Sequence, residues 1–112
     1  MPGTADLDPE DAKLLSLARA TRARVRAGTA AAVRDRDGRT YVAVEVQLPS
    51  LRLSAVQAAV AVAAASGQTA LAAVGIVGDS DRLADADRQL LGEVGVPMIL
   101  LAGPDGDLRS RG

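Results

Sequence analysis

The sequence of 112 residues contains no cysteine and no histidine, and its only aromatic residue is Tyr41. Without thiolate or imidazole side chains, the chain can form no ordinary zinc site, no cysteine nucleophile and no serine–histidine relay. Phenylalanine, tryptophan and asparagine are also missing, so few side chains remain that could stack on a nucleic-acid base or bind its edge. These absences exclude more classes of protein than any motif in the chain supports.

Charge is nearly balanced, with 13 basic and 14 acidic residues and a net charge of −1, which argues against a dedicated nucleic-acid or membrane binder. Five arginines lie early in the chain and are interpreted as a solvated helix face, with a basic stripe as the alternative. They are Arg19, Arg22, Arg24, Arg26 and Arg34. The longest apolar run, Ala58–Ala65, is too short to span a bilayer, and the N-terminus has no apolar signal region. A soluble cytoplasmic protein is therefore predicted.

Hydrophobic periodicity predicts a flexible leader over residues 1–7 and a single domain over residues 8–112. A first helix is expected from about Pro9 to Arg26, because Asp8 can cap it and a proline suits the first helical position. Gly28 is expected to end this helix.

Two strands joined by a glycine turn should follow, at about Thr29–Arg34 and Arg39–Gln47, with a break at Leu48-Pro49-Ser50. A second helix should begin near Leu53 or Ser54 and end at Ala65. This helix is apolar almost all round, so it should be buried on most sides, within the domain or against another subunit.

The second half of the chain predicts a strand from Ala70 to Val77, a helix from Asp85 to Val94 and a strand from Pro97 to Leu101. The segment Gly103-Pro104-Asp105-Gly106 predicts a turn into a short polar tail. The element order α-β-β-α-β-α-β contains one hairpin and two βαβ crossovers. It predicts an α/β fold of three α-β-α layers, with a mixed sheet of four to five strands and helices on both faces.

Three ordered stretches together resemble the small nucleoside-type cytidine deaminases, which are zinc-dependent. The stretches are Asp37-Gly38-Arg39-Thr40-Tyr41, Ser50-Leu51-Arg52-Leu53-Ser54 before the alanine-rich helix, and Arg88-Gln89-Leu90-Leu91-Gly92-Glu93 with Met98-Ile99-Leu100-Leu101 and the Asp105-Gly106 turn. The resemblance covers most of the chain from Leu14 onward and implies the cytidine deaminase fold.

The chain departs from that family at the zinc site. The family's Cys-Ala-Glu motif corresponds to Val56, Gln57 and Ala58, and its other two cysteines correspond to Ala84 and Asp87. In the family, the three ligands hold zinc, which activates a water, and the glutamate transfers the proton to the departing ammonia. The resemblance therefore predicts a degenerate member with no metal, no cofactor and no hydrolytic deamination by the family mechanism.

Acidic residues offer a weak alternative to the missing metal site. Asp79, Asp81, Asp85 and Asp87 form a run at the expected C-terminal edge of the sheet, where an ion or a partner could bind. The alternative, which the sequence favours, is that this run is solvated. The stretch with Asp85 and Asp87 offers too few oxygen ligands for a hard cation. We interpret Asp85 and Asp87 as a helix cap and a partner of the helix dipole.

The resemblance also implies where a ligand would bind. The family holds ribose through an asparagine and a glutamate whose positions correspond to Glu45 and Gln47, and both side chains could still bind a hydroxyl. The alternative, which the sequence favours, places Glu45 and Gln47 on a solvated or interface face. The family's aromatic-rich loop has no counterpart between Arg26 and Ala30.

These observations lead to the hypothesis of a catalytically inactive cytidine deaminase-like protein that acts as an oligomeric scaffold or protein-interaction module. Family members assemble as dimers or tetramers, and the helix Ala55–Ala65 suits such close packing, so a homo-oligomer is predicted through it. An additional, unidentified protein partner is a further possibility. The catalytic cavity is expected to be filled by Val56, Ala58 and Ala84, which would make that part of the core dry and apolar. The alternatives are a nucleoside- or nucleotide-binding protein without turnover, and a related hydrolase with altered chemistry.

Overall fold

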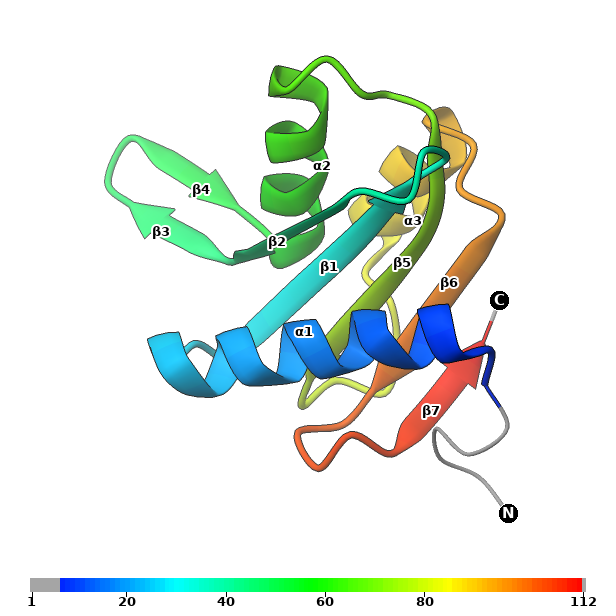
Figure 1. Ribbon diagram of the computed structural model, residues 1–112. Coiled ribbons are helices and arrows are strands. Elements are labelled where there is room, and N and C mark those ends of the chain that lie inside the picture. Colours follow the sequence, from blue (N-terminus) through cyan, green and yellow to red (C-terminus); the bar gives the residue numbers. More distant parts are fainter. Residues whose placement is uncertain (1–6, 112) are drawn as a thin grey trace.

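The computed structural model describes residues 7–111 and contains three helices and seven strands in these residues (Figure 1). The helices are α1 (Pro9–Val25), α2 (Ala55–Ala65) and α3 (Asp85–Glu93). The strands are β1 (Thr29–Asp35), β2 (Thr40–Val44), β3 (Val46–Leu48), β4 (Leu51–Leu53), β5 (Leu71–Gly78), β6 (Met98–Ala102) and β7 (Leu108–Arg111). The predicted leader, residues 1–7, lies outside the described residues except for Leu7.

Five strands form one mixed sheet in the order β2-β1-β5-β6-β7. Strand β1 is antiparallel to both β2 and β5, β5 and β6 are parallel, and β7 is antiparallel to β6. Helix α1 covers one face, while α2 and α3 cover the other (Figure 1). The predicted α/β class, the mixed sheet with helices on both faces and the three layers are therefore confirmed.

The core lies in two layers on the two faces of the sheet, and β1 contributes to both by strict alternation. Ala31 and Val33 pack toward α2 and α3, whereas Ala30 and Ala32 pack toward α1. All four are fully buried. Because these side chains are small, the helices can approach the sheet closely, which compensates for the lack of aromatic rings.

The hairpin β3–β4 is the first feature that the sequence did not predict. The predicted strand Arg39–Gln47 ends at Val44, and the chain then leaves the sheet and forms a separate two-stranded hairpin. Leu48, at the predicted strand break, pairs with Leu51 across the turn at Pro49 and Ser50. Strands of three residues carry too little pattern to be recognised in a sequence.

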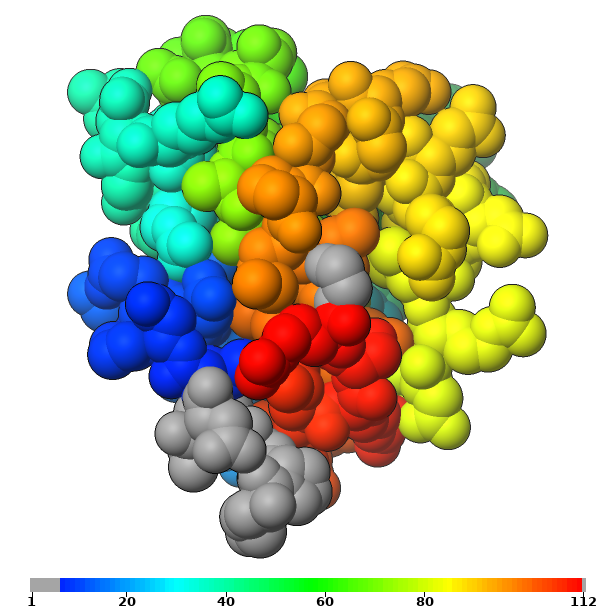
Figure 2. Space-filling model, turned by 90° about the vertical axis from the view of Figure 1, so that its right-hand side faces the viewer, coloured from blue at the N-terminus to red at the C-terminus, as the bar shows by residue number. Residues whose placement is uncertain are grey.

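Strand β7 is the second difference, because a polar tail was predicted there. Its residues pair with β6 and extend the sheet by one strand. Figure 2 shows this side of the molecule, where β7 lies between α1 and the loop that follows β5. An exposed edge strand needs few apolar residues, so the polar sequence of β7 gives no hydrophobic pattern from which a strand could be predicted. Within residues 7–111, none of the helices has the length and hydrophobicity needed to cross a membrane.

Helix α1 ends in a strained conformation that offers a direct test. Its C-terminal cap is Arg26, which adopts the left-handed conformation with φ 61°. A side chain in that region costs about 1 kcal/mol relative to glycine. We therefore expect Arg26→Gly to raise the free energy of unfolding by about 1 kcal/mol, measured by urea denaturation.

The matched control for this substitution lies two residues earlier. Arg24 is also exposed but belongs to the last turn of the helix proper, so Arg24→Gly should lower the free energy of unfolding by about 1 kcal/mol. If both glycine variants shift stability in the same direction, the left-handed cap is not the cause.

The turn between β1 and β2 is organised by a buried carboxylate. Asp35 is 1% exposed and accepts hydrogen bonds from the backbone N–H groups of Asp37 and Arg39, both at 2.9 Å, and from the Tyr41 hydroxyl at 3.0 Å. Burial by itself raises the pKa of Asp35, but these three hydrogen bonds outweigh it, and the pKa lies below its ordinary value. Burial, followed by the hydrogen bond to Asp35, raises the pKa of Tyr41. The hydroxyl of Tyr41, the only aromatic residue of the chain, therefore helps to hold the turn in place.

This lowered pKa predicts the pH dependence of stability. A carboxyl whose pKa is lower in the folded than in the unfolded state stabilises fully above its unfolded pKa of about 3.9, and loses that effect as pH falls through the folded pKa. We expect the natural chain to be more stable than the Asp35→Asn variant at pH 7, and the difference to shrink below about pH 4. Thermal unfolding of both proteins at a series of pH values measures it. A difference that stays constant down to the lowest pH would contradict this role of Asp35.

Candidate functional site

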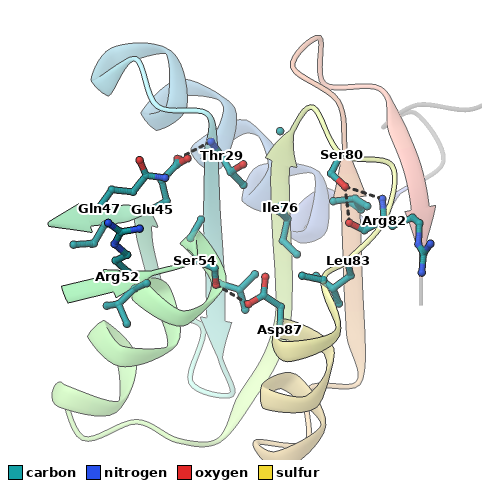
Figure 3. A pocket seen from close by; sticks show the side chains of 17 residues that line it. Thr29, Glu45, Gln47, Arg52, Ser54, Ile76, Ser80, Arg82, Leu83 and Asp87 are labelled. Atoms are coloured by element: carbon teal, nitrogen blue, oxygen red, sulfur yellow. Dashed lines mark hydrogen bonds between the residues drawn. The ribbon is translucent and has the colours of Figure 1, made fainter. Parts of the chain in front are cut away.

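A cavity of about 670 Å³ lies at the C-terminal ends of the parallel strands β5 and β6, between the starts of α2 and α3 and the β3–β4 hairpin (Figure 3). Its apolar wall includes Val56, Ile76, Leu83 and Leu101. Its polar groups come from β1, the β2–β3 junction, the hairpin, the two helix starts and the loop after β5. They are Thr29, Glu45, Gln47, Arg52, Ser54, Ser80, Arg82 and Asp87.

The structure brings together three of the four positions at which the resemblance predicts degenerate catalytic residues. Val56, Ala84 and Asp87 all line the cavity. Ala58 does not line it and is buried in the helix–sheet core, with 5% of its surface exposed. The expectation that Val56, Ala58 and Ala84 fill the cavity is wrong, because small side chains leave the space open and polar groups share its walls.

Asp87 links the starts of the two helices. Ser54 caps α2 by accepting a hydrogen bond from the Gln57 N–H at 3.0 Å, while the Gln57 side chain accepts from the Ser54 N–H at 2.8 Å. The Ser54 hydroxyl in turn donates to Asp87 at 2.6 Å. Asp87 is 8% exposed, and in Figure 3 its carboxylate faces Ser54 across the cavity floor.

The interpretation of Asp85 and Asp87 as cap and dipole partner is therefore only partly right. Both residues lie in the first turn of α3, where a negative charge is favourable. The N-cap is Ala84, however, and no side chain accepts a hydrogen bond from the start of this helix. The carboxylate of Asp87 instead accepts a hydrogen bond from Ser54 at the start of α2 and lines the cavity.

Glu45 and Gln47, which the resemblance predicts to lie at ribose-binding positions, also line the cavity. Glu45 lies between β2 and β3 and accepts a hydrogen bond from the Thr29 N–H at 2.8 Å. Gln47 is exposed on the hairpin, where it pairs with Arg52. The structure thus places both residues on the same cavity as Val56, Ala84 and Asp87.

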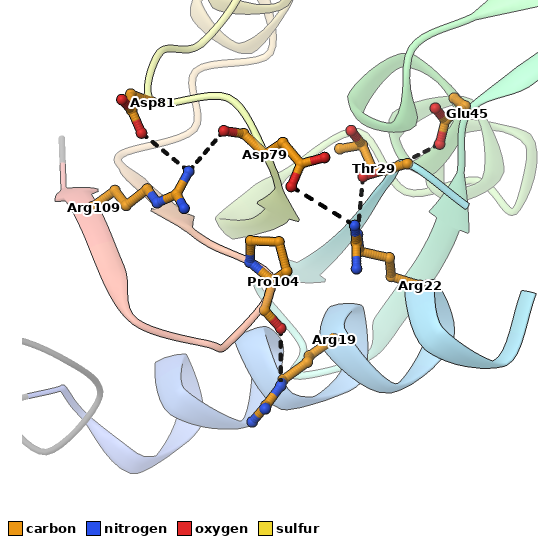
Figure 4. Close-up of polar contacts among 9 residues, drawn as sticks. Arg19, Arg22, Thr29, Glu45, Asp79, Asp81, Pro104 and Arg109 are labelled. Atoms are coloured by element: carbon orange, nitrogen blue, oxygen red, sulfur yellow. Dashed lines mark hydrogen bonds and ion pairs between the residues drawn. The ribbon is translucent and has the colours of Figure 1, made fainter. Parts of the chain in front are cut away.

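The acidic run after β5 does not form one cluster. Asp81 accepts a hydrogen bond from Arg109 at 3.0 Å, and the same guanidinium nitrogen donates to the Asp79 carbonyl at 2.8 Å (Figure 4). The Asp79 carboxylate lies 4.0 Å from Arg22. Asp79 and Asp81 therefore hold the loop against α1 and β7, and only Asp87 faces the cavity.

Three of the five early arginines make separate contacts rather than forming one basic stripe. Arg19 donates to the Pro104 carbonyl and Arg22 to the Gly28 carbonyl (Figure 4). Arg34 pairs with Asp11 at 2.9 Å. Each of these contacts ties α1 to a neighbouring segment. Nothing in this arrangement gathers their charge toward the cavity.

The residues of the cavity do not fit the zinc ion of the deaminases. Two of the three positions that would have to supply ligands carry the apolar side chains of Val56 and Ala84, and only Asp87 has a donor atom. Within residues 7–111, no group of three or more metal-binding side chains occurs. No step of a metal-dependent reaction is therefore assigned to these residues.

Sequence reasoning missed several residues of the cavity. Ser54 was recognised only as a possible helix start, although the capping sequence Ser-x-x-Gln was a usable signal. No local sequence pattern marks Ser80 or Ile76 as a cavity residue, because the crossover from β5 to α3 alone places them there. Arg52 is placed there by the unpredicted hairpin.

Comparison with known proteins identifies the fold family. Residues 7–106 match the family model described as cytidine deaminase-like. The cytidine deaminase from Burkholderia pseudomallei is similar in structure, with a TM-score of 0.75 and 27% identity over 87% of each chain. The cytidine deaminase from Mycobacterium leprae has a TM-score of 0.65 and 31% identity over 85% of this chain and 88% of its own. No curated protein sequence matches the chain. The chain belongs to the cytidine deaminase-like family.

Proposed function

We propose that this chain is a cytidine deaminase-like protein that does not deaminate and that binds a small polar molecule, such as a nucleoside or nucleotide, without turning it over. One observation carries the proposal. The cavity at the C-terminal edge of the sheet is open, with a volume of about 670 Å³. The resemblance predicts that the family's catalytic side chains are replaced around it. This volume lies within the range of ordinary small-molecule sites.

The loss of deaminase activity is supported by the chemistry of the replaced positions. Hydrolytic deamination needs a metal-activated water and a carboxylate that moves its proton to the leaving ammonia. Val56 and Ala84 cannot hold a metal, and Ala58 cannot transfer a proton and lies outside the cavity. Neither part of the mechanism has a residue to perform it.

Ligand binding is supported by the polar groups that remain. Glu45 and Gln47 carry acceptors and donors at the cavity, at the positions where the family holds ribose. The Glu45 side chain is held in place by its hydrogen bond to the Thr29 N–H. A preorganised acceptor of this kind binds a hydroxyl at a lower entropic cost than a mobile side chain does.

Two measurements test this proposal. Incubation with cytidine should release no ammonia, and calorimetry with cytidine and uridine should give dissociation constants in the micromolar to millimolar range. Gln47→Ala should weaken binding, whereas Gln68→Ala, which lies after α2 and away from the cavity, should leave it unchanged. Release of ammonia would contradict inactivity, and absence of binding to nucleosides, bases and nucleotides would contradict the binding role.

A second candidate function is that of an oligomeric interaction module, assembled through α2. The helix contains no charged residue, and its exposed positions are Ala61, Val62, Ala64 and Ala65. Leu48 and Leu51 are also exposed on the hairpin, by 54% and 48%. Sedimentation of the natural chain and of Val62→Glu tests this function: a dimer or tetramer that dissociates in the variant supports it, and a monomeric natural chain contradicts it. A cytoplasmic location remains a prediction of the sequence.

A further inference from the structure

We propose that the cavity selects a small organic cation, a molecule that carries a protonated amine or amidine on an apolar body. This inference rests on the proposed function, since it assumes that the cavity binds a small molecule without turnover. It goes beyond that function by naming the charge of the ligand, and among the molecules proposed above it disfavours the anionic nucleotides. The proposal rests on the carboxylates of Glu45 and Asp87.

Neither carboxylate has a cationic partner in the part of the chain that the structure describes. Among residues 7–111, no lysine or arginine nitrogen lies within 4.0 Å of Glu45 or Asp87, although four other ion pairs form in the same residues. Each carboxylate has one oxygen bound to a neutral donor: Glu45 Oε1 accepts from the Thr29 N–H, and Asp87 Oδ1 from the Ser54 hydroxyl. Within the described part of the chain, the second oxygen of each accepts no hydrogen bond.

Asp87 is the stronger of the two observations. It is more than nine-tenths buried and faces the cavity (Figure 3). Its charge interacts with the Ser54 hydroxyl and with the start of α3, but no cationic side chain among residues 7–111 balances it. Taking a carboxylate out of water without a counter-charge is unfavourable, and a cationic ligand would relieve this cost at the moment of binding. A hydrogen bond to a charged group is also about twice as strong as one between neutral groups.

The two arginines at the cavity do not supply the missing charge. Arg52 is exposed on the hairpin and pairs in register with Gln47. Arg82 is exposed on the opposite wall, and in Figure 3 its side chain extends away from Asp87. The interior of the cavity therefore carries negative charge, and its positive charge lies at the solvent edge.

The remaining walls indicate an organic ligand rather than a metal ion. Calcium and magnesium need six or more oxygen ligands, and no group of three metal-binding side chains occurs among residues 7–111. Val56, Ile76 and Leu83 line the same cavity and would contact the carbon skeleton of a ligand. A cationic nitrogen near Asp87 and an apolar body against these three side chains use both parts of the site.

Three compounds of nearly equal size and different charge test the proposal. Benzamidine is a cation at neutral pH, benzamide is neutral and benzoate is an anion. By calorimetry or by chemical-shift titration of the labelled protein, benzamidine should bind at least tenfold more tightly than benzamide, and benzoate should not bind. Magnesium chloride at the same concentration should leave the spectrum of the cavity residues unchanged.

Two variants connect the selectivity to the carboxylates. Asp87→Asn keeps an oxygen that can accept from Ser54 but removes the charge, so the preference for benzamidine should fall at least tenfold. Glu45→Gln should reduce the preference as well, and it provides a second test if Asp87→Asn does not fold, as judged by circular dichroism. Asp79→Asn removes an exposed carboxylate outside the cavity and should change nothing.

The outcomes separate this inference from the proposed function. Equal binding of benzamidine and benzamide, selectivity that survives in the folded charge-neutral variants, or displacement of benzamidine by magnesium would each overturn the cation proposal. If cytidine or uridine binds while benzamidine does not, the proposed function holds and the cation proposal fails. If no nucleoside, nucleotide or test compound binds, both fail.

Discussion

The triple variant Val56→Cys/Ala84→Cys/Asp87→Cys should bind one zinc ion per chain, whereas the natural chain should bind none. The three positions line a single cavity. The resemblance of the sequence to the cytidine deaminases predicts that they correspond to the metal-binding cysteines of those enzymes. Three thiolates with one open position suffice for a tight zinc site, and structural zinc contributes about 10–16 kcal/mol at neutral pH. Metal analysis after dialysis measures the stoichiometry, and cobalt substitution reports thiolate ligation through its absorption spectrum.

A matched control tests whether the zinc site depends on the positions of the three cysteines around one cavity or only on their number. In Val62→Cys/Ala84→Cys/Asp87→Cys, the first cysteine is moved to an exposed position on the same helix, away from the cavity. This protein should hold zinc at least a hundredfold more weakly. Equal zinc binding by the two variants, or none by a folded triple variant, would show that the three side chains do not meet as the family relationship implies.

Leu15→Ala should lower the free energy of unfolding by about 2–5 kcal/mol, the usual cost of deleting a fully buried leucine. Leu15 is 2% exposed and anchors α1 on the sheet at Gly75, where an added Cβ would lie 3.2 Å from the Leu15 side chain. Alanine is the commonest residue of the buried core, so the buried leucines contribute a large share of the buried apolar area. Since domains are stable by about 5–15 kcal/mol in total, this single change should remove much of the stability.

Urea denaturation of Leu15→Ala and of Leu17→Ala measures this effect. Leu17 lies on the same helix and is only half-buried, so its truncation should cost about 1 kcal/mol or less, with the same effect on helix propensity. Equal losses in the two variants would mean that the close approach of α1 to Gly75 does not concentrate stability at Leu15.

The elements with strong local signals could be predicted from the sequence. Helix α1 begins where Asp8 and Pro9 predict it, because the Asp8 side chain accepts a hydrogen bond from the Glu10 N–H. Strand β5 is a continuous apolar run and is buried along nearly its whole length, as its sequence requires. Caps and buried runs depend on neighbours in the chain, which is why the sequence reveals them.

The elements with weak local signals could not be predicted. The hairpin β3–β4 and the edge strand β7 are short or polar, and their existence depends on pairing with each other or with β6. The orientation of the Asp87 side chain could not be predicted either. In the sequence it is an acid in the first turn of a helix, and only the position of Ser54, 33 residues away, turns it toward α2.

By itself, the sequence determined which chemistry is absent: without cysteine or histidine, no thiolate or imidazole can hold a metal at the positions of Val56, Ala84 and Asp87. It also determined the order of the main elements, because caps and periodicity are local properties. Only the tertiary structure decided that the cavity stays open and that the carboxylates of Glu45 and Asp87 share it without a cationic partner among residues 7–111. The physical reason is that open space and unbalanced charge depend on which distant residues the sheet and its crossovers bring together, and residue types alone do not contain that information.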